Sequence, residues 1–243
     1  LSGVRSQIAI KIFGEDLDAL RGQADALRAK LATIPGIADL QIEKQVLAPQ
    51  IKVRIDYAAA AQYGVPAPQV LSALLTTVLG AGAMFTLYTY ISPVLHTITH
   101  ATPAFVTGML VLIGVGFSIG NYLGGKLADR SVNGTLKGFL LLLMVIMLAI
   151  PFLARNELGA AVSMVVWGAA TFAVVPPLQM RVMRVASEAP GLSSSVNIGA
   201  FNLGNALGAA AGGAVISGGL GYSFVPVMGA IVAGLALLLV FIS

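Results

Sequence analysis

The sequence has 243 residues, of which 57% are hydrophobic and only 10% are charged, with a formal net charge of +4. Its mean hydropathy of +0.90 argues against a water-soluble domain and is typical of proteins that cross a membrane several times. The chain has no cysteine, which excludes disulfides and thiolate metal sites, and its basic residues are too scattered for a nucleic-acid surface.

The charges are unevenly distributed along the chain. Residues 1–74 hold 15 of the 24 Asp, Glu, Lys and Arg side chains, and the rest of the chain holds nine. A membrane-spanning helix requires an apolar run of about 20 residues with almost no charge. We therefore expect a soluble segment, residues 1–73, joined to a transmembrane domain, residues 74–243. The chain begins at Leu1 without a signal-type pattern, so we expect no cleavable targeting segment and a fragment of a longer protein.

The soluble segment contains strand-like and helix-like patterns. Residues 7–13 alternate apolar with polar or small side chains, which predicts a half-buried strand. A helix follows from the acidic residues at 15–18 to Pro35-Gly36, because leucine and alanine recur there at helical spacing. Residues 37–44 and 50–55 predict two further strands, followed by a short helix from Asp56 to Gly64 and another that starts at Pro66. The order β-α-β-β-α predicts an open half of a ferredoxin-like α+β sandwich.

Three short stretches of this segment carry a family resemblance. They are Phe-Gly-Glu-Asp-Leu at 13–17, Ile-Pro-Gly-Ile-Ala-Asp-Leu at 34–40 and Ala-Ala-Gln-Tyr-Gly at 60–64. In this order they resemble a porter subdomain of the heavy-metal-type resistance-nodulation-division efflux pumps, over residues 1 to about 74. The resemblance implies passage of copper or silver through methionine clusters. Residues 1–74 contain no Met, Cys or His, so no metal-binding residue is carried over.

From residue 74 onward the pattern predicts six membrane-spanning helices, over residues 74–95, 104–125, 135–154, 158–180, 194–217 and 222–242. The connections after the second and fourth spans are basic, whereas the opposite side has only Arg155. By the positive-inside rule those connections are cytoplasmic, as are both ends of the helical domain. We expect a multi-pass protein of a bacterial-type inner membrane. The basic residues are Lys126, Arg130, Lys137, Arg181 and Arg184.

The connection after the second span carries a specific motif, Gly-Asn-Tyr-Leu-Gly-Gly-Lys-Leu-Ala-Asp-Arg at 120–130. It resembles the Gly-x-Leu-Ala-Asp-Arg signature of the major facilitator superfamily, and its degraded continuation favours the second-half copy of that signature. The glycines allow close approach of two helix ends, and the aspartate can accept hydrogen bonds from a helix N-terminus or an arginine. Such a clasp would hold one alternating-access state; the alternative is an ordinary acidic-basic loop. The gating candidates are Gly120, Gly124, Gly125, Asp129 and Arg130.

Residues 85–93 and 174–179 are similar to the arabinose-efflux-permease type of the same superfamily, so this resemblance covers about residues 74–243. It implies helices seven to twelve of a fold in which two six-helix bundles surround a central cavity. It also implies a lipid bilayer and a small-molecule substrate, such as an organic solute, a drug or a sugar. Half a transporter would work only as a homodimer or with a missing N-terminal half.

Two glycine ladders occur in the second and fifth spans. Glycine at every fourth residue leaves one helix face bare, which permits close packing in a membrane, where lipid supplies no hydrophobic drive for association. The fifth-span ladder also resembles the glycine-rich helix motif of proton-coupled drug antiporters. Helix packing and a direct role in rocking both remain open. The ladders are Gly116, Gly120 and Gly124, and Gly204, Gly208 and Gly212.

Few side chains are candidates for lining a cavity. No ionisable group is expected deep inside a span, so this half lacks the carboxylate of a proton relay. The candidates are polar or aromatic, and each could instead form hydrogen bonds between helices. They are Thr86, Tyr90, Asn121, Trp167, Gln179, Asn197, Asn202 and Asn205. His96 and His100 are four residues apart, but nearby prolines favour a loop and no third ligand predicts a metal site.

The sequence shows no hydrolytic triad, phosphate-binding loop or paired carboxylate, so we expect no enzymatic activity, cofactor or metal. A porter subdomain belongs on the periplasmic side, whereas the loop charges place residue 74 in the cytoplasm. This conflict favours a recombined reading frame, an engineered chimera or a natural truncation. We expect a half-size or chimeric major-facilitator-type efflux transporter. The alternatives are a non-transporting membrane fragment and a fragment of a heavy-metal efflux pump.

Overall fold

The computed structural model describes residue 10 and residues 17–34, 67–187 and 190–242. Contacts between Cα atoms divide the chain into two compact units, residues 1–52 and residues 53–243. Each unit is described by itself below.

Unit 1–52 contributes one described helix, α1 (Leu17–Leu31). This confirms the predicted helix, although α1 ends before Pro35-Gly36, in a turn where the hydroxyl of Thr33 donates to the carbonyl oxygen of Lys30 (2.7 Å). One face of α1 is half-buried and apolar, as the helical spacing requires. It consists of Leu20, Ala24, Leu27 and Leu31.

The other predictions for the front segment fall largely outside the described residues. They are the strands over 7–13, 37–44 and 50–55 and the short helix that ends at Gly64. Ile10 is described, but it belongs to no helix or strand. The described part of this unit contains a helix and no strand, so the ferredoxin-like α+β arrangement has no support there.

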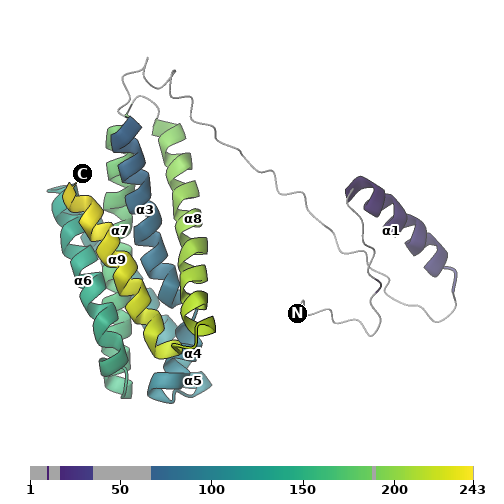
Figure 1. Cartoon of the computed structure of the whole chain (residues 1–243), viewed down its shortest axis with the longest axis horizontal. Helices are drawn as coiled ribbons and strands as arrows, with labels where there is room; N and C mark the ends of the chain where they lie inside the picture. Colours follow the sequence, from purple (N-terminus) through teal and green to yellow (C-terminus); the bar gives the residue numbers. More distant parts are fainter. Residues whose placement is uncertain (1–9, 11–16, 35–66, 188–189, 243) are drawn as a thin grey trace. The chain divides into compact units, whose positions relative to one another are not determined.

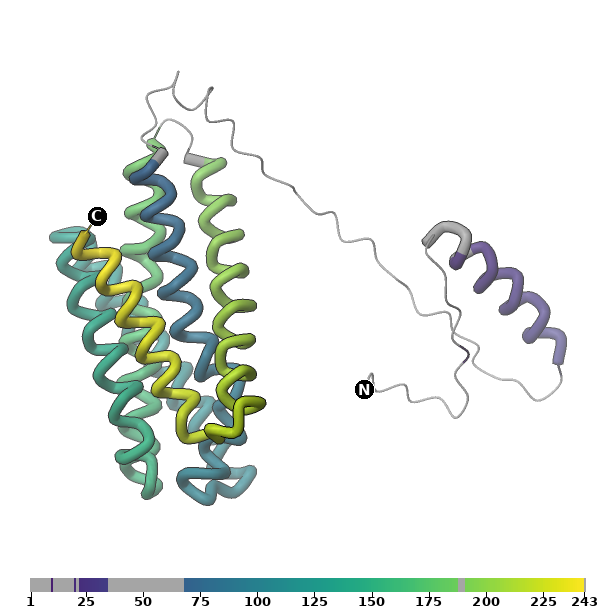
Figure 2. Tube along the Cα trace, viewed as in Figure 1, coloured from purple at the N-terminus to yellow at the C-terminus, as the bar shows by residue number. Residues whose placement is uncertain are grey.

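The described part of unit 53–243 is a bundle of six long helices with two short elements (Figure 1). Successive long helices run antiparallel through the bundle, and α3 begins at the end where α9 finishes (Figure 2). The elements are α3 (Ala67–Tyr88), α4 (Ile91–Thr99), α5 (Pro103–Ala128), α6 (Val132–Leu153), α7 (Glu157–Val185), α8 (Pro190–Ser217), the 3-10 helix η1 (Tyr222–Phe224) and α9 (Val225–Ile242).

Side-chain caps fix where three of the long helices begin. The hydroxyl of Thr102 accepts from the Phe105 amide at the start of α5, where Pro103 occupies the first helical position. Ser131 caps α6 through the Gly134 amide (3.1 Å), and Asn156 caps α7 through the Gly159 amide (2.8 Å). Each cap satisfies a backbone N–H group that has no partner within the helix. The residues at these positions therefore determine where the three helices begin.

Among the described residues, five helices are long and apolar enough to cross a membrane. They are Pro68–Tyr88, Pro103–Ala128, Val132–Leu153, Glu157–Val185 and Tyr222–Ile242. This confirms the prediction of a mainly helical domain with several membrane spans. Helix α8 has 28 residues but is not among the five, because its glycine, serine and asparagine residues lower its hydropathy.

The outer helices expose apolar side chains along their length. These side chains recur at helical spacing on one face of α6 and one face of α9, as expected for helices that face lipid tails. They include Leu141, Val145, Leu148 and Phe152 of α6, and Ile231, Leu235, Leu238 and Phe241 of α9.

The predicted first span, residues 74–95, is wrong at both ends. Helix α3 begins at Ala67, which agrees with the helix predicted to start at Pro66; that helix and the predicted span form one continuous helix. It ends at Tyr88, and α4 begins at Ile91, so the predicted span is broken. The prediction of a loop around His96 is also wrong. Pro93 lies in the first turn of α4. The N–H groups of a first turn have no partner within the helix, so a proline there removes no helical hydrogen bond.

The predicted boundary between residues 73 and 74 falls inside α3, which continues through it. The predicted fourth span, residues 158–180, is too short at its end. Helix α7 continues through Arg181 and Arg184 to Val185, and Arg181 is buried at 9% exposure. These two arginines are therefore helical residues rather than loop residues. Helix α7 also contains Pro176 and Pro177 in its interior.

Candidate functional site

The long helices are arranged in two tightly packed pairs. Helix α5 packs mainly on α7, and α3 packs mainly on α8, while α3 and α7 contact each other much less. Helices α6 and α9 pack against each other and cover α7 and α3 respectively. The seam where α3 and α8 meet α7 is therefore the place where the two pairs join, and it carries three of the candidate side chains, Trp167, Gln179 and Asn197.

The first glycine ladder lies against α7. A methyl group on Gly116 would lie 2.5 Å from the carbonyl oxygen of Val165. Gly120 lies against the backbone of Ala169, and Gly124 lies against the backbone of Ala173. Because backbone atoms cannot rotate aside, no side chain fits at these three glycines without separating the helices.

The second glycine ladder lies against α3. Gly204 faces the backbone of Val78 and the methyl group of Ala81, and Gly208 faces the backbone of Gly82. Gly212 faces the ring of Tyr90, whose hydroxyl donates to the carbonyl oxygen of Ala209 (2.9 Å).

A chain of hydrogen bonds links the two pairs across the seam. The hydroxyl of Thr77 on α3 donates to Oδ1 of Asn197 on α8 (2.8 Å), and Nδ2 of Asn197 donates to Oε1 of Gln179 on α7 (2.5 Å). Nε2 of Gln179 then donates to the hydroxyl of Ser194 on α8 (2.9 Å). We name these four residues the polar network. Sequence reasoning chose Gln179 and Asn197 but missed Thr77 and Ser194, because a hydroxyl in an apolar helix gives only a weak signal.

An aromatic cluster lies farther along the same seam. The ring of Tyr88 stacks on Trp167 at 6.4 Å between centroids, and Phe117 contacts Tyr88, Trp167 and Phe172 at 6.1, 6.2 and 4.0 Å. Trp167 is completely buried, and its Nε1 has no hydrogen-bond partner among the described residues. On α7, Gln179 lies about 18 Å from Trp167 at the helical rise per residue. The seam thus has a polar end and an aromatic end.

The remaining cavity candidates do not join the polar network. The hydroxyl of Thr86 donates to the carbonyl oxygen of Gly82 in its own helix (2.8 Å). Asn121 and Asn202 are exposed, and Asn205 is half-buried. Within the described ranges no group of three or more His, Cys, Asp or Glu side chains is close enough to hold a metal ion.

The gating motif lies where α5 ends and α6 begins. Gly120 and Gly124 face α7, whereas Gly125 has no atom within 4 Å of the place where a Cβ would lie. Asp129 is the C-cap residue of α5, and Arg130 is exposed. In the part of the chain that the structure describes, no hydrogen bond or ion pair reaches the Asp129 carboxylate.

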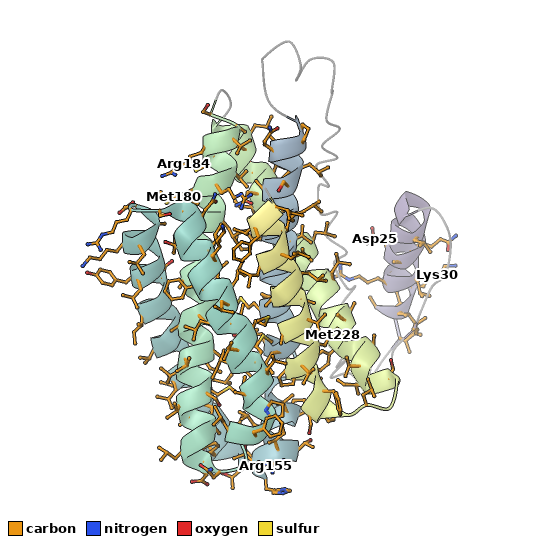
Figure 3. All side chains as sticks on the ribbon, turned by 60° about the vertical axis from the view of Figure 1, so that its left-hand side comes forward. Asp25, Lys30, Arg155, Met180, Arg184 and Met228 are labelled. Atoms are coloured by element: carbon orange, nitrogen blue, oxygen red, sulfur yellow. The ribbon has the colours of Figure 1, made fainter. Side chains whose placement is uncertain are left out.

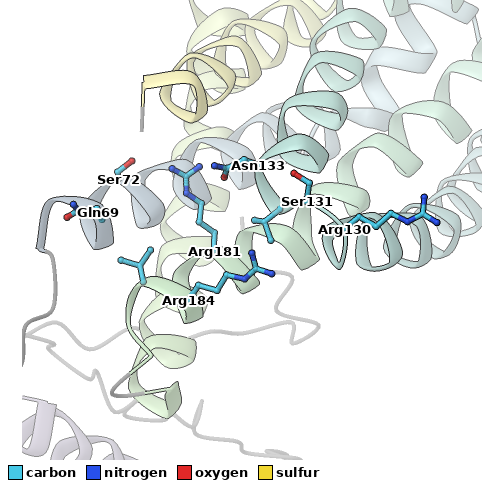
Figure 4. A pocket seen from close by; sticks show the side chains of 9 residues that line it. Gln69, Ser72, Arg130, Ser131, Asn133, Arg181 and Arg184 are labelled. Carbon is cyan, nitrogen blue, oxygen red and sulfur yellow. The ribbon is translucent and has the colours of Figure 1, made fainter.

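A basic pocket of about 460 Å³ lies beside the gating motif, at the end of the bundle where α3 begins (Figure 4). Three arginines line it, from α7 and from the α5–α6 connection, and among the described residues no acidic side chain lines it. Figure 3 labels Arg184 near this end of the bundle and Arg155 near the other end. The Arg-x-x-Arg spacing on one helix could have revealed the pocket. Its lining is Gln69, Ser72, Arg130, Ser131, Val132, Asn133, Arg181, Arg184 and Val185.

Comparison with known proteins gives different relatives for the two parts of the chain. The AcrB/AcrD/AcrF family matches residues 1–93. The inner membrane transport protein YdhP of Escherichia coli strain K12 is 96% identical over 176 residues, which are 72% of this chain and 45% of that protein. The protein of the same name in Escherichia coli O157:H7 is 94% identical over 176 residues, with the same coverage. The uncharacterized MFS-type transporter YfhI of Bacillus subtilis strain 168 is 32% identical over 171 residues, 70% of this chain and 43% of that protein.

The chain spans less than half the length of these relatives. An aligned stretch of 176 residues in a chain of 243 includes all of α5 and α6, wherever it begins. The matched part therefore contains two helices that are long and apolar enough to span a membrane, and the motif at residues 120–130. The helical region of this chain is closely similar to part of an inner membrane transport protein, and several of its helices are long and apolar enough to span a membrane.

Proposed function

We propose that unit 53–243 is the second six-helix half of an inner-membrane efflux transporter of the major-facilitator type. It would work by alternating access, together with another six-helix half or with a second copy of itself. The observation that carries the proposal is the 96% identity to a protein named as an inner membrane transport protein. The proposal assigns no catalytic residue and no cofactor to the chain.

The seam between the helix pairs supports an alternating-access mechanism. Contacts are extensive within each pair, and the pairs are joined through the smaller α3–α7 contact and through α6 packed on α9, so a tilt of one pair against the other would slide these contacts and keep each pair intact. The polar network then joins the pairs in this state through Asn197 and Gln179. Its breaking and remaking would accompany the tilt.

The seam also supports a substrate class. Its polar network offers amide and hydroxyl groups, and its aromatic cluster offers ring faces about 18 Å away along α7. Small organic solutes, drugs or sugars carry the matching combination of hydroxyl groups and flat apolar surface. Thr77, Asn197 and Trp167 are fully buried in this state, so in our proposal a substrate reaches the seam only after the two pairs tilt apart.

The gating motif would act at the end of the seam. Asp129 and Arg130 lie directly after α5, whose glycine ladder holds it against α7. A carboxylate at this place can accept hydrogen bonds from an arginine or a helix N-terminus of the other half. The basic residues near this end place it, in our proposal, on the cytoplasmic side of the inner membrane.

The proposal is tested by transport measured in reconstituted vesicles. The full chain is assayed alone and together with the first half of its Escherichia coli relative, with ethidium and arabinose as probes. We expect efflux of at least one probe when both halves are present, or from the full chain alone where two copies form the transporter, and its loss in Asn197→Ala but not in Asn121→Ala. A folded assembly without flux, under conditions where the complete relative transports, would refute the transporter assignment. A measurement of oligomeric mass in detergent separates a homodimer from a monomer.

The match of residues 1–93 to a pump family supports one alternative, a fragment of a heavy-metal efflux pump. That alternative predicts stabilisation of the full chain by copper or silver ions. The absence of Met, Cys and His from residues 1–74 argues against it, since these are the side chains that bind such ions. A thermal shift with Ag⁺ at stoichiometric concentration would favour it over the major-facilitator assignment.

A further inference from the structure

We propose that the basic pocket binds the phosphate headgroup of an anionic phospholipid, with one acyl chain lying in an adjoining apolar groove. This inference does not depend on transport, because it concerns the outer wall of the bundle and the bilayer around it. It rests on two cavities that share a border.

The basic pocket has the chemistry of a phosphate site. Arg130, Arg181 and Arg184 line it together with the polar side chains of Gln69, Ser72 and others, and no carboxylate from the described part of the chain lines it. Figure 4 shows Arg181 extending toward Asn133 and Ser72, and Arg184 extending toward Ser131. Guanidinium groups bind phosphate through paired hydrogen bonds, and hydroxyl and amide groups can supply the remaining donors.

The adjoining groove has the chemistry of an acyl-chain site. Its volume is about 420 Å³, and carbon atoms form nearly all of its surface. It runs from the end of α5 along the first turns of α6, the helix whose exposed face is apolar. Its lining is Leu127, Arg130, Ser131, Gly134, Thr135, Gly138, Phe139 and Leu142.

Arg130 and Ser131 line both cavities, so the polar and apolar sites meet at these two residues. A free phosphate ion would use the pocket and leave the groove empty. A phospholipid carries its phosphate next to its acyl chains. This matches a polar cavity and an apolar cavity that meet at two residues. Basic pockets between membrane helices are recognised sites for anionic headgroups. The combination therefore favours a lipid over a soluble anion.

The test uses the full chain in neutral detergent, with apparent melting temperature and native mass spectrometry as readouts. Phosphatidylglycerol is titrated against phosphatidylcholine, and inorganic phosphate and glycerol phosphate form separate arms. We expect stabilisation and retention of phosphatidylglycerol only. The affinity should fall about fivefold for each arginine removed, in Arg184→Gln and then in the double variant with Arg130→Gln. Arg155→Gln, at the other end of the bundle, is the matched control and should leave the affinity unchanged.

The groove is tested separately. Gly138→Leu should fill it, because no atom lies within 4 Å of the place where a Cβ would be added. Gly108→Leu is the control, since that glycine is equally open and lies near the start of α5. Loss of lipid retention in Gly138→Leu alone supports the acyl-chain site. Equal retention in both variants, equal losses in Arg184→Gln and Arg155→Gln, or full stabilisation by inorganic phosphate would each overturn the proposal. The wild-type comparison of lipid with glycerol phosphate stands even if an arginine variant fails to fold.

Discussion

The glycine ladder of α5 makes the strongest prediction about stability. Replacing Gly120 with alanine places a methyl group against the backbone of Ala169, with that residue's carbonyl carbon only 2.8 Å away. An ordinary contact between two carbon atoms needs about 3.5 Å or more, so α5 and α7 must move apart by roughly 1 Å at this point. Overpacking of this kind costs about 1–3 kcal/mol, and the upper part of that range applies here because the obstacle is backbone.

The same substitution at Gly114 is the matched control. Gly114 lies on the same helix, but no atom lies within 4 Å of an added Cβ. Gly114→Ala should be neutral or slightly stabilising, since alanine is the better helix former. In thermal unfolding of the purified chain in detergent, Gly120→Ala should melt on the order of 4–12 °C below Gly114→Ala. Equal melting temperatures would show that the close approach of α5 and α7 does not contribute to stability.

Four further outcomes follow from the described residues. Gly208→Leu should abolish a monodisperse elution peak on size-exclusion chromatography, because Gly208 lies against the backbone of Gly82. Gly199→Leu, on the open side of the same helix, should leave that peak unchanged. Asn197→Ala should lower the free energy of unfolding by about 1–2 kcal/mol, since Gln179 Oε1 loses its donor and the Thr77 hydroxyl keeps only the Ala73 carbonyl oxygen of its own helix. An equal effect of the exposed Asn121→Ala would contradict this reason. Trp167 is the single tryptophan of the chain and is fully buried, so its fluorescence should be blue-shifted and resist quenching by iodide, and efficient quenching would contradict its burial. The chain has no cysteine, so a single introduced cysteine can be labelled specifically. In intact cells the label should modify Arg155→Cys from outside, and it should modify Asn133→Cys only after permeabilisation. The opposite result would reverse the proposed orientation.

Much of the fold is predictable because apolar runs in a membrane chain have few alternatives to a helix. The spans over 104–125, 135–154 and 222–242 correspond to α5, α6 and η1 with α9 to within a few residues. Errors occur where the apolar run and the helix do not coincide. Helix α3 extends back through polar residues to Ala67, and α7 extends forward through two arginines to Val185. Hydropathy therefore predicts which residues can cross the membrane, but it does not predict where a helix ends.

The candidate site is only partly predictable, for a related reason. The spacing of Gly204, Gly208 and Gly212 predicts a bare helix face, but it does not identify α3 as the helix against it. That pairing depends on packing across many residues. Likewise, Asn197 and Gln179 stand out as amides in apolar helices, whereas Thr77 is ordinary until its partner is known. The basic pocket takes residues from three separate stretches of chain, so the Arg-x-x-Arg spacing on α7 indicates only part of it.

The two prolines inside α7 weaken the backbone hydrogen bonding of this helix at one level. Pro176 and Pro177 have no N–H groups, so the carbonyl oxygens of Phe172 and Ala173 lose their usual donors four residues later. The carbonyl of Ala173 faces Gly124, whose bare Cα–H groups are the weak donors nearest to it. A helix that lacks two hydrogen bonds at one level bends there at a lower cost than elsewhere. A bend at this level would move the part of α7 that holds Arg181 relative to the part that holds Trp167.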